Sequence, residues 1–395
     1  MPSAMGFLQR FWSYAILLTV PVVIPPAFRL TLLQFCAGVL TGCIATYYVI
    51  PGVYNIFIYP FYVSPLRHRP GPKIRSGDPT EPYTTWMRTW PGERFIRAIG
   101  FGHSDVLLVT RIDAFREIFQ TKADLFIKPK FHTRIITPIT GVGVVFSKGE
   151  EHKKIIRQRR AEINAGKVDI GAEPDMLTYM LMEQSVENPW PEDKIMDNVL
   201  NFMVAGYETS GNTLTWATNR LSIRPDIQDK LRAEVQGLLA RKLNPDYADL
   251  EGLRYLNNFC KENLRFQASG IMAAREATED VEVCGSLIPK GTSLLMIPHI
   301  INRNPAIWGD DVDEFNPDRW DNLSGDAKDP FALATFLFGP RSCIGRVFAM
   351  LEMKMVLVEV LSKFRFEPEV KQEDIVRVNP CPALRVSGGL KVRVR

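Results

Sequence analysis

The chain of 395 residues lacks several features that would place it in other classes of protein. Its formal net charge is only +4, from 48 basic and 44 acidic residues, and it has no long basic run or arginine-aromatic stripe. We therefore expect no nucleic-acid partner. The dinucleotide-binding pattern G-x-G-x-x-G is also absent, so any flavin or nicotinamide cofactor would be held by a separate protein.

The cysteines form no compact framework either. None of the six has a C-x-x-C neighbour, which argues against a zinc site or a disulfide scaffold and favours reduced cytosolic or membrane-buried thiols. They are Cys36, Cys43, Cys260, Cys284, Cys343 and Cys381. With 46% hydrophobic residues, a chain of this length can bury one large core or two smaller ones.

Two apolar stretches, residues 11–28 and 30–66, lie near the N-terminus without an internal charge. Residues 30–50 contain no proline and are long enough to cross a hydrocarbon core of about 30 Å, so we expect a transmembrane helix there. Prolines in the first stretch leave a broken span, a re-entrant segment or an interfacial one open. A cleavable signal peptide is disfavoured because no small-residue cleavage site ends a short apolar core.

The sequence predicts three parts. Residues 1–63 form a membrane anchor, residues 64–73 a basic, proline-rich linker, and residues 74–395 the catalytic domain. Arg67, Arg69 and Lys73 in the linker favour the cytoplasmic side of the membrane.

The stretch Phe-Leu-Phe-Gly-Pro-Arg-Ser-Cys-Ile-Gly at 336–345 places Cys343 directly ahead of a helix predicted at 346–364. Gly339 and Gly345 let the backbone turn tightly and approach a ligand closely. The helix N-terminus directs its free N–H groups toward the sulfur, which favours the thiolate that binds metal. For a cysteine considered alone, a buried structural role is the alternative.

These residues match the pattern F-x-x-G-x-R-x-C-x-G at every fixed position, namely Phe336, Gly339, Arg341, Cys343 and Gly345. The chain thereby resembles the haem-thiolate monooxygenases of the cytochrome P-450 superfamily. The resemblance implies a mainly α-helical fold with small β-sheets, and haem b with Cys343 as the axial iron ligand. It also implies that Arg341 pairs with a haem propionate and that Phe336 packs under the ligand loop.

The segment Ala-Gly-Tyr-Glu-Thr-Ser at 205–210 lies in a long helix predicted to begin with Pro191 at its first position. Gly206 and the hydroxyl of Thr209 predict a local kink or an opening of the hydrogen-bond ladder. A kinked core helix with solvent-facing Glu208 is the plain alternative. The segment resembles the oxygen-binding groove of the family, which implies that Thr209 holds bound oxygen and Glu208 supports proton delivery.

A second helix, predicted at 255–266, carries Glu262-Asn-Leu-Arg265, with acid and base on one face. Glu251-Gly-Leu-Arg254 has the same form, so the pair alone is not decisive. The element Phe-Asn-Pro-Asp-Arg-Trp at 315–320 resembles the family segment whose arginine completes a buried network. The resemblance therefore assigns Glu262, Arg265 and Arg319 to a network that stabilises the ligand side of the core.

The resemblance is interrupted near Lys154–Ile155. His152 resembles a residue of the family's haem-edge helix, but the chain after Lys154 looks like a much later family segment. The resemblance implies that about a hundred residues that would roof the substrate pocket are missing, through a gene-model or splicing loss or in a natural short variant. Arg157, Arg159 and Arg160 are candidate replacements for the lost propionate partner.

The remaining expectations concern the pocket wall. Strands are predicted at 106–109, 281–288 and 292–297, and a helix at 114–121. Arg275 looks like a further propionate partner, Ser269-Gly270 carries the turn into the pocket, and Cys381 lies in a C-terminal pocket loop rather than acting as a ligand.

The resemblance implies a monooxygenase that uses NADPH-derived electrons, supplied by a separate reductase, to oxidise a lipophilic small molecule. It is most similar to fungal enzymes that tailor secondary metabolites such as terpenoids or polyketides. We expect an endoplasmic-reticulum membrane location with the catalytic domain facing the cytoplasm. Arg341, Arg346 and Lys354 are candidates for docking an acidic partner. The alternatives are an inactive or merely haem-binding relic and an enzyme that rearranges peroxides without a reductase.

Overall fold

The computed structural model describes residues 37–43, 47, 80–99, 105–129, 149–167, 175–182, 191–270, 272–378 and 383–395. The chain divides into two compact units, Met1–Ser64 and Pro65–Arg395. Most of the predicted anchor, all of the linker and Cys381 lie outside the described residues. In these ranges, no helix combines the length and the apolar character that crossing a membrane requires. The predicted span at 30–50 is described only at 37–43 and 47.

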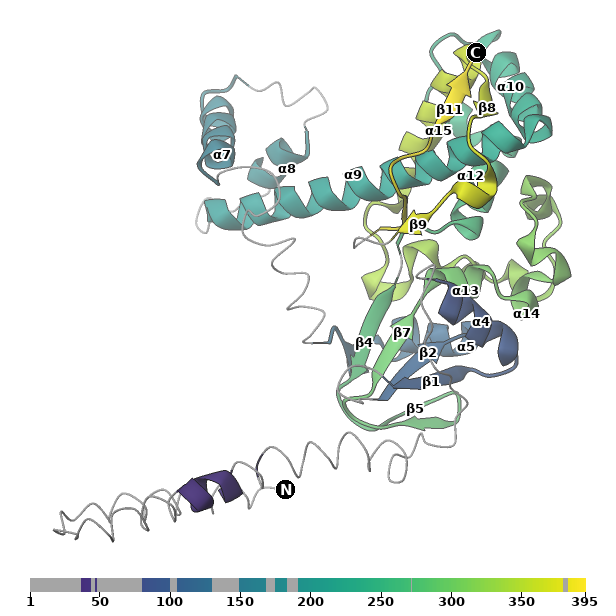
Figure 1. The fold of residues 1–395 in the computed structure, drawn as a ribbon. Helices are drawn as coiled ribbons and strands as arrows, with labels where there is room; N and C mark the ends of the chain where they lie inside the picture. The colour runs from purple at the N-terminus through teal and green to yellow at the C-terminus, as the bar shows by residue number, and fades with distance from the viewer. Residues whose placement is uncertain are drawn as a thin grey trace. The chain divides into compact units, whose positions relative to one another are not determined.

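The second unit is mainly helical, and its helices gather around α9 (Glu192–Ile223), as Figure 1 shows. The C-terminal half of α9 packs against α10 (Pro225–Leu239), α12 (Arg254–Phe266) and α15 (Arg346–Lys363). These helices pair because each has an apolar face, such as Ile227, Leu231 and Val235 of α10. The other described helices of this unit are α4 (Glu81–Thr89), α5 (Ile112–Arg116), α7 (Gly149–Asn164), α8 (Met176–Met182), α11 (Tyr247–Glu251), α13 (Pro298–Asn302) and α14 (Pro305–Trp308).

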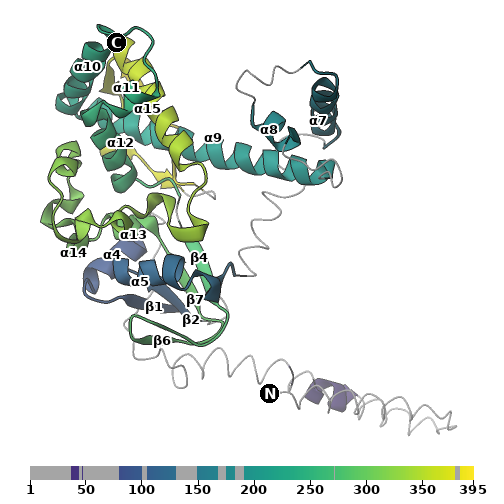
Figure 2. The same cartoon turned by 180° about the vertical axis from the view of Figure 1, so that it is seen from behind.

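A five-stranded sheet forms a second core, with α4 and α5 beside it (Figures 1 and 2). Its strand order is β1-β2-β7-β4-β3, and only β2 and β7 are parallel. Leu294 of β7 pairs with Leu107 of β2 on one side and with Arg275 of β4 on the other. The strands are β1 (Phe95–Ile99), β2 (Asp105–Val109), β3 (Phe126–Ile127), β4 (Ala273–Ala277) and β7 (Ser293–Met296).

Three two-stranded ribbons contain the remaining strands of the described residues. Short 3-10 helices and one π-helical turn, Glu117–Thr121, lie between these elements. They pair β5 (Val281–Val283) with β6 (Ser286–Ile288), β8 (Phe366–Pro368) with β11 (Val392–Val394), and β9 (Arg377–Val378) with β10 (Arg385–Val386). The single strand predicted at 281–288 is therefore wrong. Cys284 and Gly285 have φ of 48° and 73°. These left-handed conformations form the turn that joins β5 and β6 into a hairpin.

Two further expectations about helices need correction. Pro191 caps α9 rather than occupying its first position, because its ψ of 145° is extended. The helix then runs without interruption through Gly206, so the predicted opening of its ladder is not seen. The predicted join near Lys154–Ile155 falls inside α7, which is also one continuous helix. Figures 1 and 2 show α7 and α8 beside the N-terminal half of α9.

Candidate functional site

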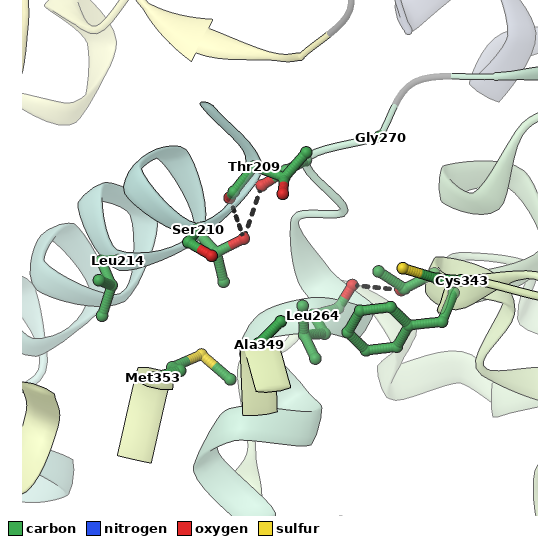
Figure 3. A pocket seen from close by; sticks show the side chains of 12 residues that line it. Thr209, Ser210, Leu214, Leu264, Gly270, Cys343, Ala349 and Met353 are labelled. Carbon is green, nitrogen blue, oxygen red and sulfur yellow. Dashed lines mark hydrogen bonds between the residues drawn. The ribbon is translucent and has the colours of Figure 1, made fainter. Parts of the chain in front are cut away.

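Cys343 and Thr209 line the same pocket, although 134 positions separate them in the sequence. Figure 3 shows Thr209 and Ser210 of α9 on one side of this space and Cys343 on the other. The space measures about 620 Å³ when the volume open to solvent at its mouth is included. Its remaining lining is mostly apolar and includes Leu214 and Leu264. The fold thus places the predicted metal ligand opposite a hydroxyl group across an apolar space.

The loop that carries Cys343 is fixed at its own ends. The backbone N–H of Cys343 donates to the carbonyl of Phe336 at 2.8 Å, and Gly345 is the N-cap of α15. Phe336 packs against the helical core formed by α9, α10, α12 and α15. The thiol of Cys343 is exposed toward the pocket, which suits a ligand to a bound group.

The same loop is also anchored to the sheet core, through a residue that the sequence pattern did not single out. Phe338 stacks on Phe331 with ring centroids 4.1 Å apart and contacts Phe115 edge-on. Gly339 then passes close to the π-helical turn Glu117–Thr121, which directly follows α5. A Cβ added at Gly339 would lie 2.0 Å from the carbonyl oxygen of Phe119 in that turn. With φ of +64°, Gly339 is required both by its backbone conformation and by this contact.

Two arginines near the loop test whether haem fits the site. Arg275 is 6% exposed and lies 4.6 Å over the Phe119 ring. Within the part of the chain that the structure describes, its guanidinium donates only to the neighbouring Ala274 carbonyl. Its pKa is lowered by burial and by the charge of Arg341. Among the described residues, neither guanidinium has a carboxylate partner. Two neighbouring cations without an acid complement the two propionates of haem, so the residues present fit that group.

The hydroxyl groups of α9 are held by its own backbone. Thr209 Oγ1 donates to the Ala205 carbonyl at 2.5 Å, and Thr213 Oγ1 donates to the Thr209 carbonyl at 2.7 Å. Thr213 is also 2.7 Å from Ser269 Oγ, which links α9 to the turn after α12. Glu208 does not line the pocket with Thr209. Of the two residues predicted to handle oxygen, Thr209 therefore lines the pocket and Glu208 does not.

Glu262 is the centre of a buried network. Both of its oxygens accept from Arg265 at 2.8 Å, and Arg319 Nε donates to it at 3.2 Å. The Asn316 N–H and the Trp320 indole N–H complete the set at 2.9 and 3.0 Å. Glu262 and Arg265 are fully buried, and a buried carboxylate needs such dense pairing to offset its lost hydration.

Other basic and acidic residues have partners away from the pocket. Glu251 and Arg254, the pair of similar form, do not bond to each other, since Arg254 pairs with Asp321. Lys354 is 1% exposed and donates to Glu251 at 2.5 Å, so the prediction that it docks a partner is wrong. Arg157 pairs with Glu192 at 3.0 Å, and Arg159 pairs with Asp175.

Arg157 and Arg159 thus each have a carboxylate partner away from the pocket. Arg160 also has an interaction of its own. The side chain of His152 lies outside the described part of the structure, although its backbone belongs to α7.

Asn302 is a structural residue that sequence reasoning missed. Its amide donates to the Leu264 carbonyl and to Thr335 Oγ1, and its oxygen accepts from the Ala334 N–H. These bonds tie α13 to the segment entering the ligand loop. No short motif marks this residue, because its partners are 32 to 38 positions away.

Comparisons with known proteins bear on this geometry. A model of the cytochrome P-450 family matches residues 150–387. Cytochrome P-450 monooxygenase sphH of Aspergillus fumigatus is 27% identical over an alignment that covers 80% of this chain and 86% of that protein. FUM15 of Gibberella moniliformis is 30% identical over 65% of this chain and 50% of its own length. ALT8 of Alternaria alternata is 32% identical over 52% of this chain and 41% of its own length. The chain spans half or less of these last two proteins.

The alignment with sphH is longer than the chain itself, at 464 positions. Eighty per cent of 395 residues is about 316, so about 148 aligned positions contain no residue of this chain. Relative to sphH, this chain therefore lacks a substantial amount of internal sequence.

Proposed function

Because the chain belongs to the cytochrome P-450 family and is of the fungal type, we propose that it is a haem-thiolate monooxygenase. It would insert one oxygen atom from O2 into a lipophilic small molecule. The observation that carries this proposal is the shared pocket of Cys343 and Thr209, with Arg275 and Arg341 beside the ligand loop. The apolar lining suits the hydrophobic ring system of haem, and the lipophilic substrate is proposed from the similarity to the family.

Each residue has a defined task in this proposal. Haem bound through a thiolate supplies the chemistry that activates oxygen. Cys343 provides the sulfur ligand, while Arg341 and Arg275 neutralise the propionates and fix the orientation of the group. Thr209 presents a hydroxyl across the pocket and can pass a proton from water to a substrate-side oxygen. Leu214 and Leu264 help keep bulk water from the apolar part of the site.

The wider setting is part of the same proposal. Electrons come from NADPH through a separate reductase, because the chain contains no G-x-G-x-x-G dinucleotide motif. Residues 30–50 anchor the protein in the endoplasmic-reticulum membrane with the catalytic domain in the cytoplasm. The fungal relatives sphH, FUM15 and ALT8 support, by similarity alone, a role in making secondary metabolites of the terpenoid or polyketide class.

A second candidate is an inactive or merely haem-binding relative. It is favoured by Met203 and Tyr207 of α9, which are 52% and 79% exposed next to the proposed oxygen side of the pocket. It is also favoured by the positions absent from the sphH alignment, which we place near Lys154–Ile155. The loss of roof helices would leave the site open to water. Sequencing transcripts across this junction tests the idea, and finding only the short form would contradict a splicing loss.

The carbon monoxide complex of the reduced protein tests the haem assignment. We expect the red-shifted Soret band of thiolate-bound haem in the wild type and its loss in Cys343→Ala. Cys284→Ala is the matched control, because this cysteine lies in the β5–β6 hairpin and contacts Glu117 instead. Persistence of the band in Cys343→Ala would refute the ligand assignment. A normal band without product formation would instead favour the second candidate.

A further inference from the structure

Two guanidinium groups lie over the ring of Phe266, the last residue of α12. Arg220 of α9 lies 4.3 Å from the ring centroid, and Arg303, directly after α13, lies 3.9 Å from it. Because both contact the same ring, their central carbons are at most about 8 Å apart. Arg377 of β9 is close enough for its charge to act on Arg220. Like charges held this close repel one another in a protein interior.

Acidic groups do not balance this charge. Asp313 is the carboxylate that pairs with Arg303, and it is shared with Arg88. Arg265 is also near the ring but is neutralised by Glu262. The guanidinium of Arg220 has no ion pair or hydrogen bond with any described residue. Arg88 and Arg303 therefore share Asp313, and Arg220 has no acidic partner among the described residues.

Several donors in the cluster are also without an acceptor. The buried Nε atoms of Arg220 and Arg303 have no hydrogen-bond partner, and neither does the Nε2 donor of the adjacent Gln267, which is 2% exposed. The amide oxygen of Gln267, an acceptor, is also without a partner. Stacking on Phe266 uses the faces of the guanidinium groups. Arg303 Nη1 still donates to the Phe266 carbonyl at 3.3 Å and Nη2 donates to Asp313, so the unsatisfied donor of Arg303 is its Nε. Burial and the neighbouring arginines lower the pKa of Arg220 to about 10, so it stays charged at neutral pH.

We propose that Arg220 and Arg303 bind a small inorganic anion of the halide type beside Phe266. An anion would accept from the free Nε donors and would offset the excess positive charge. A water molecule could satisfy a donor but would leave the charge uncompensated. The site is separate from the pocket of Cys343 and Thr209, since none of these arginines lines that pocket. It would stabilise the junction of α9, α12 and α13 independently of the proposed activity.

Chloride dependence of thermal unfolding tests the site in the full-length, haem-loaded chain. Chloride is titrated at constant ionic strength, with gluconate as the replacement. We expect the Tm to rise by about 1–2 °C for each tenfold increase in chloride above the dissociation constant. Arg220→Met should abolish this slope, because it removes the unpaired cation and keeps an apolar stem over Phe266.

Arg241→Met is the matched control, because Arg241 is exposed and donates only to the Gly237 carbonyl. It should keep the slope. Equal slopes in the wild type and in Arg220→Met would indicate a general salt effect and overturn the proposal. A flat wild-type response would mean that only water occupies the site. Crystals with bromide in place of chloride give a test that needs no variant, since an anomalous peak is expected beside Arg220 and its absence would overturn the assignment.

Discussion

Gly339→Ala should be among the most damaging small substitutions in the ligand loop. Gly339 has φ of +64°, and a left-handed conformation costs an L residue about 1–2 kcal/mol. The new Cβ would also lie 2.0 Å from the Phe119 carbonyl oxygen, where ordinary contacts exceed 3.4 Å. Phe119 is 1% exposed and its ring lies 4.7 Å from that of Phe115, so its backbone has little room to yield. Overpacking of this kind costs about 1–3 kcal/mol more.

We therefore expect Gly339→Ala to lower the free energy of unfolding by about 2–5 kcal/mol, measured from urea transitions. The reduced carbon monoxide spectrum should weaken in parallel, because moving the loop displaces Cys343. Gly291→Ala is the matched control, since Gly291 has φ of +80° but no atom within 4 Å of an added Cβ. It should show only the backbone cost of about 1–2 kcal/mol. If the two variants were destabilised equally, the close contact with Phe119 would not hold the loop.

Three further predictions concern the residues behind and opposite Cys343. Glu262→Gln should lower the free energy of unfolding in urea by about 3–5 kcal/mol, because it leaves the buried Arg265 uncompensated. Asp311→Asn changes an exposed partner of Arg319 and should cost less than about 1 kcal/mol. Similar values for the two variants would contradict the buried network. Thr209→Ala should raise NADPH consumption and peroxide per product. Thr215→Ala should not, because this half-buried threonine of α9 has the same type of backbone bond but does not line the pocket of Cys343. Unchanged coupling in Thr209→Ala would count against its role. Burial raises the pKa of Cys260 from 9.0 to about 12, so its contribution to stability is present below pH 9 and is lost as pH rises toward 12. The urea midpoint of the wild type should therefore fall relative to Cys260→Ala between pH 8 and 10.5, and a constant difference would refute the burial effect.

Local patterns predicted much of the fold. The helices predicted at 255–266 and 346–364 begin and end within one residue of α12 and α15, because apolar periodicity and capping act over one or two turns. The hairpin at β5–β6 was missed because the left-handed conformation of Cys284 is unusual for a residue other than glycine. The docking role of Lys354 was wrong for a different reason. Lys354 was expected on the surface of α15, but it is buried and paired with Glu251, which lies 103 positions away in the sequence.

The sequence by itself determined the family, the identity of the sulfur ligand in the proposal, and the pairing of Glu262 with Arg265. These follow from short spacings, since residues three apart on a helix meet whatever the rest of the chain does. Only the tertiary structure decided that Thr209 rather than Glu208 lines the pocket and that Gly339 passes against Phe119. It also decided that Arg220 and Arg303 share one aromatic ring without a matching acid. Such contacts join segments tens to hundreds of residues apart, and their geometry depends on how the two cores pack around the loop that carries Cys343.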